Sequence, residues 1–140
     1  MSLLRQKIKL SPNCDKYIFL GGVPHERLIK LGLYRLGDIY LSASKTETEG
    51  IAMREAMVYG LPVLAVKANA SSEIVIHEYN GFLLDPDSID EFTSSIEQLS
   101  KDSVLLKKMG KQAIQSVDAY TIKKVVERLV EIYSSTIIPL

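Results

Sequence analysis

The chain has 140 residues, and its 17 Lys and Arg residues balance 17 Asp and Glu residues, so the formal net charge is zero. This length fits one domain with a buried core, and 46% hydrophobic against 24% charged residues excludes a disordered chain. Balanced charge offers no electrostatic basis for binding nucleic acid or an anionic membrane. The single cysteine, Cys14, excludes an internal disulfide, and no apolar run is long enough to span a bilayer. We therefore expect a cytoplasmic protein that forms one domain over residues 1–140.

Short apolar runs alternate with helical patterns along the chain. The expected strands are residues 17–20, 38–41, 63–66 and 82–84. The expected helices are residues 26–34, 50–59, 72–77, 89–99, 105–117 and 122–133. Strands that alternate with helices through short loops predict an α/β fold with a parallel sheet.

Several residues are expected to fix where these helices begin and end. Gly60 stands where a C-terminal cap belongs. Ser88, followed by Glu91 three residues later, has the form of a capping box. Thr121 is expected to cap the last helix.

Two loops after expected strands are candidates for ligand binding, because ligands in parallel α/β folds collect at the carboxyl ends of strands. The first contains Gly21, Gly22 and Val23, where the lack of side chains lets another group approach the backbone. A tight turn is the simpler explanation for this loop. The second runs from Ser42 into a helix near Gly50, whose first amides suit an anion such as a phosphate.

Two glutamates lie on either side of that helix start. Glu55 lies within the helix and Glu47 in the loop, and each carboxylate can accept bonds from two hydroxyls of a sugar or ribose. On spacing alone, solvated surface acids are the simpler explanation for both glutamates.

The sequence gives little indication of a metal site, a nucleophilic cysteine or a known phosphate-binding motif. His25 and His77 lack a cluster of further ligands at metal-binding spacing, and Cys14 has no visible activating neighbour. Neither a phosphate-binding loop of the Gly-x4-Gly-Lys type nor a Gly-x-Gly-x-x-Gly fingerprint occurs.

One block does resemble a known signature. Residues 42–65, SASKTETEGIAMREAMVYGLPVLA, resemble the hallmark of the retaining GT-B glycosyltransferases of family 4, the glycosyl transferases group 1. The family's Glu, seven residues, and second Glu fall on Glu47 and Glu55. Flanking segments at residues 19–26, 34–38 and 73–84 agree in order and distance, so the resemblance covers nearly the whole chain.

The resemblance implies a Rossmann-like C-terminal domain that binds a nucleotide sugar such as a UDP- or GDP-sugar, with no metal and no other cofactor. It implies that Glu47 holds hydroxyls of the transferred sugar and takes the catalytic position, while Glu55 holds the ribose. The remaining implied donor contacts are the amides of Glu49 and Gly50 on the sugar, those of Ile51 and Ala52 on the distal phosphate, and Gly21, Gly22 and Val23 against the base.

Family members have two domains, and this chain matches only the later part of the C-terminal one. The resemblance implies that the opening strands of that domain, their Arg and Lys, and the acceptor-binding N-terminal domain are missing here. We expect the fragment alone to be inactive, and a strand-swapped homo-oligomer is one way to fill the sheet. The Thr-Glu-Thr-Glu-Gly sequence at residues 46–50 is similar to that of members that act on lipids, so the full enzyme can be peripheral to a membrane.

Two other functions stay open at this point. One is a nucleotide-sugar-binding module that works with a separate catalytic chain. The other is an inactive remnant that associates through exposed strand edges and the apolar residues 137–140. Binding that depends on Glu55 separates the first two functions from the third.

Overall fold

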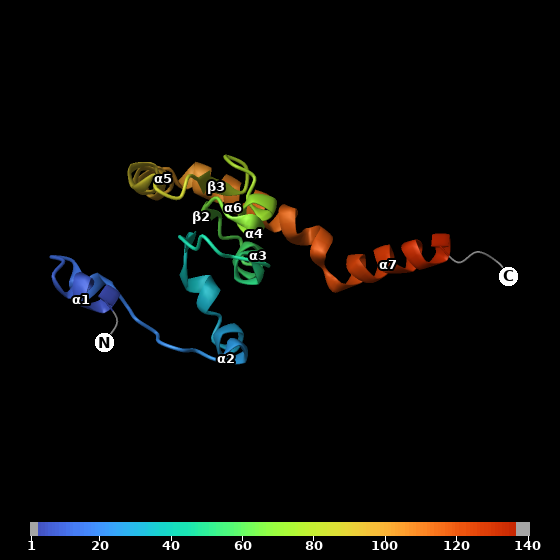
Figure 1. Cartoon of the computed structure of the whole chain (residues 1–140), viewed down its shortest axis with the longest axis horizontal. Coiled ribbons are helices and arrows are strands. Elements are labelled where there is room, and N and C mark those ends of the chain that lie inside the picture. The colour runs from blue at the N-terminus through green and yellow to red at the C-terminus, as the bar shows by residue number, and fades with distance from the viewer. Residues whose placement is uncertain (1–2, 137–140) are drawn as a thin grey trace. The chain divides into compact units, whose positions relative to one another are not determined.

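The computed structural model describes residues 3–136. Its contacts divide the chain into two units, one that ends at Gly32 and one that begins at Leu33 (Figure 1). The division falls after Gly32, which has a positive φ of 63°. Residues with a Cβ adopt this backbone conformation only at a cost in free energy.

The first unit contains α1 (Leu3–Lys9), the 3-10 turn η1 (Cys14–Lys16) and α2 (His25–Lys30). The strand expected at residues 17–20 is wrong: these residues form no regular element, and all four are exposed. A strand requires a neighbouring strand for its backbone N–H and C=O groups. Among residues 3–136, no strand pairs with this segment. The β-branched and aromatic residues of this segment are therefore not sufficient to predict a strand.

The helix expected over residues 26–34 is also shorter than predicted. Helix α2 ends at Lys30, and the chain resumes after Gly32 as the 3-10 turn η2 (Leu33–Leu36). The left-handed conformation of Gly32 interrupts the helical hydrogen bonding, and it separates Tyr34 from α2.

The second unit is built on a three-stranded parallel sheet, in the order β1 (Tyr40–Ser42), β2 (Val63–Val66) and β3 (Gly81–Leu84). Strand β2 is buried throughout, as expected for a strand covered on both faces. These strands confirm the predicted α/β class, although β1 begins two residues later than expected.

Helices cover both faces of this sheet. They are α3 (Ile51–Val58), α4 (Asn69–Ile74), α5 (Ile89–Lys101) and α6 (Ser103–Val117). The chain then continues through the 3-10 turn η3 (Asp118–Tyr120) into α7 (Ile122–Thr136). On one face, Met53 and Met57 of α3 pack with Val63 and Ala65 of β2. On the other, Leu64 of β2 packs with α5 and α6.

Capping explains where several helices begin and end. Gly60 has a φ of 80° just after α3, which confirms the expected C-terminal cap. The capping box expected at Ser88 is wrong, because its side chain makes no capping hydrogen bond. Instead, Asp102 caps α6 by accepting from Val104 N and Leu105 N at 3.0 and 2.8 Å.

Two further helix boundaries differ from expectation. Helix α4 begins three residues before the expected start, because the Ser71 hydroxyl accepts a hydrogen bond from Ala68 N at 2.8 Å and stabilises an earlier first turn. Helix α7 follows Thr121 as expected, but no side chain in it is buried. The apolar residues 137–140 lie outside the described residues.

Candidate functional site

The loop after β1 leads into α3 at the carboxyl end of the sheet, and Gly50 is the residue on which this connection depends. It precedes α3 with a φ of 64° and is buried. A Cβ at this position would overlap Cδ1 of Ile74 in α4, so a side chain is excluded by both conformation and space. Glycine at position 50 thus allows α3 and α4 to pack closely at the helix start.

Glu47 is tied to this start by two hydrogen bonds. Its Oε1 accepts from Gly50 N at 3.0 Å, and its backbone carbonyl accepts from Ala70 N at 3.2 Å. The half-buried carboxylate therefore stabilises the turn that enters α3. In this arrangement the Gly50 amide, which the family resemblance assigns to a sugar, is already bound to Glu47.

Glu55 lies one turn further along α3 and is also half-buried. Its Oε2 accepts a hydrogen bond from the Tyr34 hydroxyl at 2.9 Å. Burial, followed by this hydrogen bond and the negative charge of Glu55, raises the pKa of the Tyr34 phenol well above its ordinary value. The hydroxyl is therefore held in its protonated, donating form.

The two glutamates lie on either side of the start of α3. Glu47 Oε1 accepts from Gly50 N just before the helix, and Glu55 lies one turn inside it. Tyr40 is the first residue of β1; burial raises the pKa of its phenol, and the charges of Glu47 and Glu55 raise it further.

Aromatic side chains form one wall of this region. The Tyr34 ring stacks on Tyr59 with centroids 5.5 Å apart and an interplanar angle of 24°, and it lies 6.5 Å from Tyr40. The Arg35 guanidinium lies 5.6 Å from the Tyr59 centroid. Sequence reasoning missed Tyr34 as a site residue. No local pattern connects Tyr34 to Glu55, because their contact spans 21 residues.

The first turn of α3 supplies the remaining predicted contacts. Its earliest amides, including those of Ile51 and Ala52, have no acceptor within the helix, and both residues are exposed. Glu49 is exposed as well, and its carbonyl accepts a hydrogen bond from Arg54. The helix dipole adds positive potential at this end, so the turn can attract an anion.

The glycine loop belongs elsewhere in the chain. Gly21, Gly22 and Val23 lie in the first unit, whereas α3 lies in the second. Gly21 has a φ of 71°, which accounts for glycine at that position by turn geometry. The contact of this loop with a base stays a prediction.

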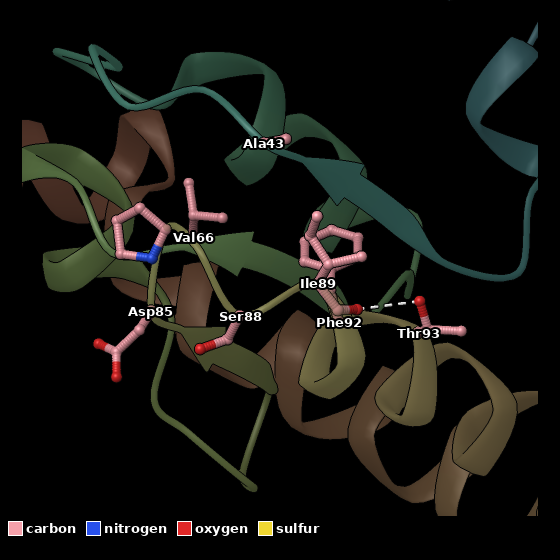
Figure 2. Close-up of a pocket in the computed structure, with 8 residues that line it drawn as sticks. Ala43, Val66, Asp85, Ser88, Ile89, Phe92 and Thr93 are labelled. Atoms are coloured by element: carbon pink, nitrogen blue, oxygen red, sulfur yellow. Dashed lines mark hydrogen bonds between the residues drawn. The ribbon is translucent and has the colours of Figure 1, made fainter.

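A separate apolar pocket opens at the same end of the sheet, on the face covered by α5. It has a volume of about 210 Å³ and is lined by Ala43, Val66, Asp85, Pro86, Ser88, Ile89, Phe92 and Thr93 (Figure 2). None of the predicted site residues lines it. Its walls are mostly hydrocarbon, which suits an apolar group better than a phosphate or a sugar.

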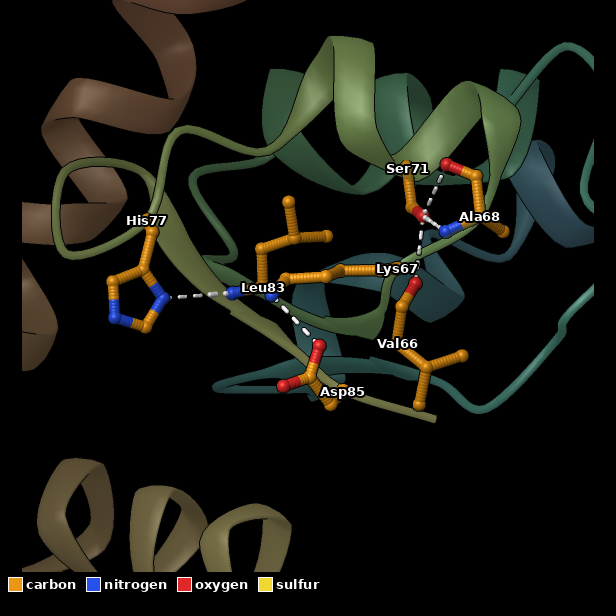
Figure 3. A network of polar contacts seen from close by, with 7 residues as sticks. All are labelled: Val66, Lys67, Ala68, Ser71, His77, Leu83 and Asp85. Carbon is orange, nitrogen blue, oxygen red and sulfur yellow. Dashed lines mark hydrogen bonds and ion pairs between the residues drawn. The ribbon is translucent and has the colours of Figure 1, made fainter. Parts of the chain in front are cut away.

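Polar contacts stabilise the loops next to this pocket (Figure 3). Lys67 Nζ lies 2.7 Å from Asp85 Oδ1, which joins the ends of β2 and β3. His77 Nδ1 accepts from Leu83 N at 3.2 Å, which gives that ring a structural role. Within residues 3–136, no group of three or more His, Cys, Asp or Glu side chains gathers in a geometry that holds a metal.

Comparison with known proteins shows the family of this chain. The model of the family described as "Glycosyl transferases group 1" matches residues 3–116. The chain belongs to this family. A curated member, the sulfoquinovosyl transferase SQD2 of Arabidopsis thaliana, is 28% identical over 106 residues. That alignment covers 74% of this chain and 20% of the relative, so the chain spans about a fifth of its length.

Solved structures of glycosyltransferases share the fold. The C-terminal domain of the group 1 protein LpcC from Francisella tularensis is 34% identical and superposes with a TM-score of 0.74, covering 85% of this chain and 61% of that one. Anabaena HepE in complex with UDP is 25% identical with a TM-score of 0.67, covering 79% and 35%. The second unit is therefore the Rossmann-like sheet of a GT-B C-terminal domain. Within residues 3–136, no helix is long and apolar enough to cross a membrane.

Proposed function

We propose that this chain forms the donor-binding part of a retaining glycosyltransferase of family 4, which transfers a hexose from a nucleotide sugar to a glycan or lipid acceptor. The observation that carries this proposal is the placement of both acids at the start of α3, where Glu47 Oε1 accepts from Gly50 N at 3.0 Å and Glu55 lies one turn inside the helix. Carboxylates that accept hydrogen bonds from hydroxyls and backbone amides that donate to an anion are the two recognition elements that a nucleotide sugar requires.

Each group then has a distinct role. The Glu55 carboxylate accepts the ribose hydroxyls, and the amides of Ile51 and Ala52 face the distal phosphate. Glu47 holds the transferred sugar next to the backbone of Glu49 and Gly50. To offer its amide to the sugar, Gly50 exchanges the bond that it makes to Glu47 in this structure. Gly21, Gly22 and Val23 are proposed to lie against the base.

The binding of UDP by a relative supports the choice of ligand. HepE was solved with UDP, and the structures agree over 79% of this chain. We propose that the donor is a UDP- or GDP-sugar, bound without a metal, and that the domain extends over residues 1–140. Transfer also needs an acceptor held against the donor, so the complete enzyme requires an acceptor-binding domain. A cytoplasmic location is part of this proposal and follows from composition alone.

A binding module without transfer activity is the second candidate. It is favoured by the small share of the curated relative that the chain spans, because a fifth of that protein's length leaves most of the molecule outside this chain. Addition of an acceptor-binding domain and a transfer assay would separate the two functions. Both share the same donor site.

Ligand-observed NMR with UDP-glucose, GDP-mannose and the two free diphosphates tests this site directly. Glu55→Ala removes charge-assisted hydrogen bonds worth about 1.5–3 kcal/mol each, so it should weaken nucleotide binding at least tenfold. Glu91→Ala is the matched control, because Glu91 is an exposed acid on α5 away from this site. Equal affinity of the unmodified chain and Glu55→Ala would refute the proposed site.

A further inference from the structure

Tyr34 is the side chain that holds the Glu55 carboxylate in place. Its hydroxyl donates to Glu55 Oε2 at 2.9 Å across 21 residues of sequence. The contact joins η2, where Tyr34 lies, to the middle of α3. A single hydrogen bond from a half-buried, protonated phenol restricts the rotation of a carboxylate that would otherwise sample several rotamers.

The Tyr34 ring is itself held by its neighbours. It stacks on Tyr59, the residue that directly follows α3. The Arg35 guanidinium lies by Tyr59, and Tyr40 lies by Tyr34. The ring is therefore packed against the end of α3, and its hydroxyl is directed at the carboxylate by packing as well as by hydrogen bonding.

We propose that Tyr34 is a positioning residue that orients Glu55 toward the ribose 2′- and 3′-hydroxyls of the nucleotide. This inference rests on the proposed function. A carboxylate has about four lone-pair directions, so Oε2 can accept from Tyr34 and from a ribose hydroxyl at once. Fixing the carboxylate plane before the ligand arrives lowers the entropy lost on binding. Tyr34 itself touches neither nucleotide nor sugar in this arrangement.

The test compares UDP with 2′,3′-dideoxy-UDP, which lacks the two ribose hydroxyls. Tyr34→Phe keeps the ring and its stack and removes only the donor. Its Kd for UDP should rise on the order of fivefold, and its Kd for the dideoxy nucleotide should stay within about twofold, because Glu55 has no ribose hydroxyls to accept there. A general loss of structure would weaken both nucleotides equally.

Tyr59→Phe is the matched control. It removes a hydroxyl from the other ring of the stack, and within residues 3–136 no hydrogen bond from that hydroxyl is found. Its Kd for UDP should be unchanged. In a Glu55→Ala background, Tyr34→Phe should lose most of its effect, since the acceptor of the Tyr34 hydroxyl is already gone.

The outcomes separate the inference from the proposed function. If Glu55→Ala leaves UDP binding unchanged, or no nucleotide binds at all, the proposed function fails and the inference fails with it. If Glu55→Ala weakens UDP but Tyr34→Phe does not, the site stands and the role of Tyr34 is refuted. Equal weakening of both nucleotides by Tyr34→Phe also overturns it.

Discussion

The backbone amide of Gly50 donates to Oε1 of Glu47 at 3.0 Å, so the residue proposed to hold the sugar also stabilises the turn that enters α3, the helix proposed to bind the phosphate. The contact spans three residues and closes the loop that leads from β1 to α3. Loop conformation and the proposed sugar contact therefore involve the same carboxylate.

Glu47 should distinguish a sugar nucleotide from a free diphosphate. Glu47→Ala removes the acceptor for the sugar hydroxyls, and we expect at least a tenfold loss of UDP-glucose affinity. UDP should bind within about threefold of the unmodified chain, because the ribose and phosphate contacts do not use Glu47. Titration by NMR measures both constants. An equal loss for both ligands would contradict this division of roles.

The hydrogen bond from Gly50 N to Glu47 should stabilise the fold even when the charge of Glu47 is removed. Glu47→Gln keeps an oxygen that can accept from Gly50 N, whereas Glu47→Ala does not. We expect Glu47→Ala to lower the free energy of unfolding by about 1 kcal/mol and Glu47→Gln by less. Urea unfolding followed by circular dichroism gives both values. If the two variants are equally destabilised, the hydrogen bond to Gly50 has no stabilising role.

Gly50 should be intolerant of any side chain, for two reasons that can be measured apart. Gly50→Ala should cost about 2 kcal/mol or more, because the residue has a φ of 64° and its Cβ would overlap Ile74 Cδ1. Ile74→Val removes that methyl group. In the Ile74→Val background, Gly50→Ala should lower the free energy of unfolding by less. The loss that persists measures the cost of placing alanine at a positive φ. An unchanged cost would show that the overlap is relieved in another way.

The shifted phenol of Tyr34 gives the fold a specific dependence on alkaline pH. The pKa of Tyr34 is raised above its ordinary value of 10.0 in the folded chain, first by burial and then by its bond to Glu55. The folded chain therefore keeps a proton that the unfolded chain releases, so this stabilisation is complete below pH 10 and is lost as the pH rises above it. Tyr34→Phe should lose less stability than the unmodified chain above pH 10. If the free energy of unfolding of the two proteins falls equally with pH, the raised pKa of Tyr34 is contradicted.

An expected helix cap at Ser88 and a cap that the structure shows at Asp102 form a matched pair. Asp102 accepts from two amides of α6, whereas Ser88 makes no capping hydrogen bond with α5. Asp102→Ala should lower the free energy of unfolding by about 1 kcal/mol, and Ser88→Ala should have only a few tenths of that effect. Thermal unfolding of both variants measures the difference. If Ser88→Ala lowers the free energy of unfolding by as much as Asp102→Ala, Ser88 does cap α5 as the sequence predicts.

The sequence predicts the second unit well, because its signals are local and agree with one another. The continuous apolar run at β2 and the glycine after α3 both correspond to what the structure forms. The run at residues 17–20 has similar composition but forms no strand, since strand formation depends on a partner that composition does not reveal. A local sequence pattern therefore predicts a strand only where a neighbouring strand is available to pair with it.

The candidate site was predictable in part. Glu47 and Glu55 stand out through the family resemblance and the helix start between them. The role of Tyr34 was not predictable from periodicity, because its contact with Glu55 joins segments 21 residues apart. Gly32 interrupts the expected helix and allows Tyr34 to leave α2 and lie over α3. Such a contact depends on tertiary packing.

The most direct test of the donor site is to map the backbone amide shifts of the isotope-labelled chain on titration with UDP. We predict that the largest shifts fall on the loop and first turn around Gly50, Ile51 and Ala52, with saturation that is lost in Glu55→Ala. Shifts centred on the apolar pocket of Val66, Ile89 and Phe92, or no shifts at any of these positions, would contradict a donor site at the start of α3.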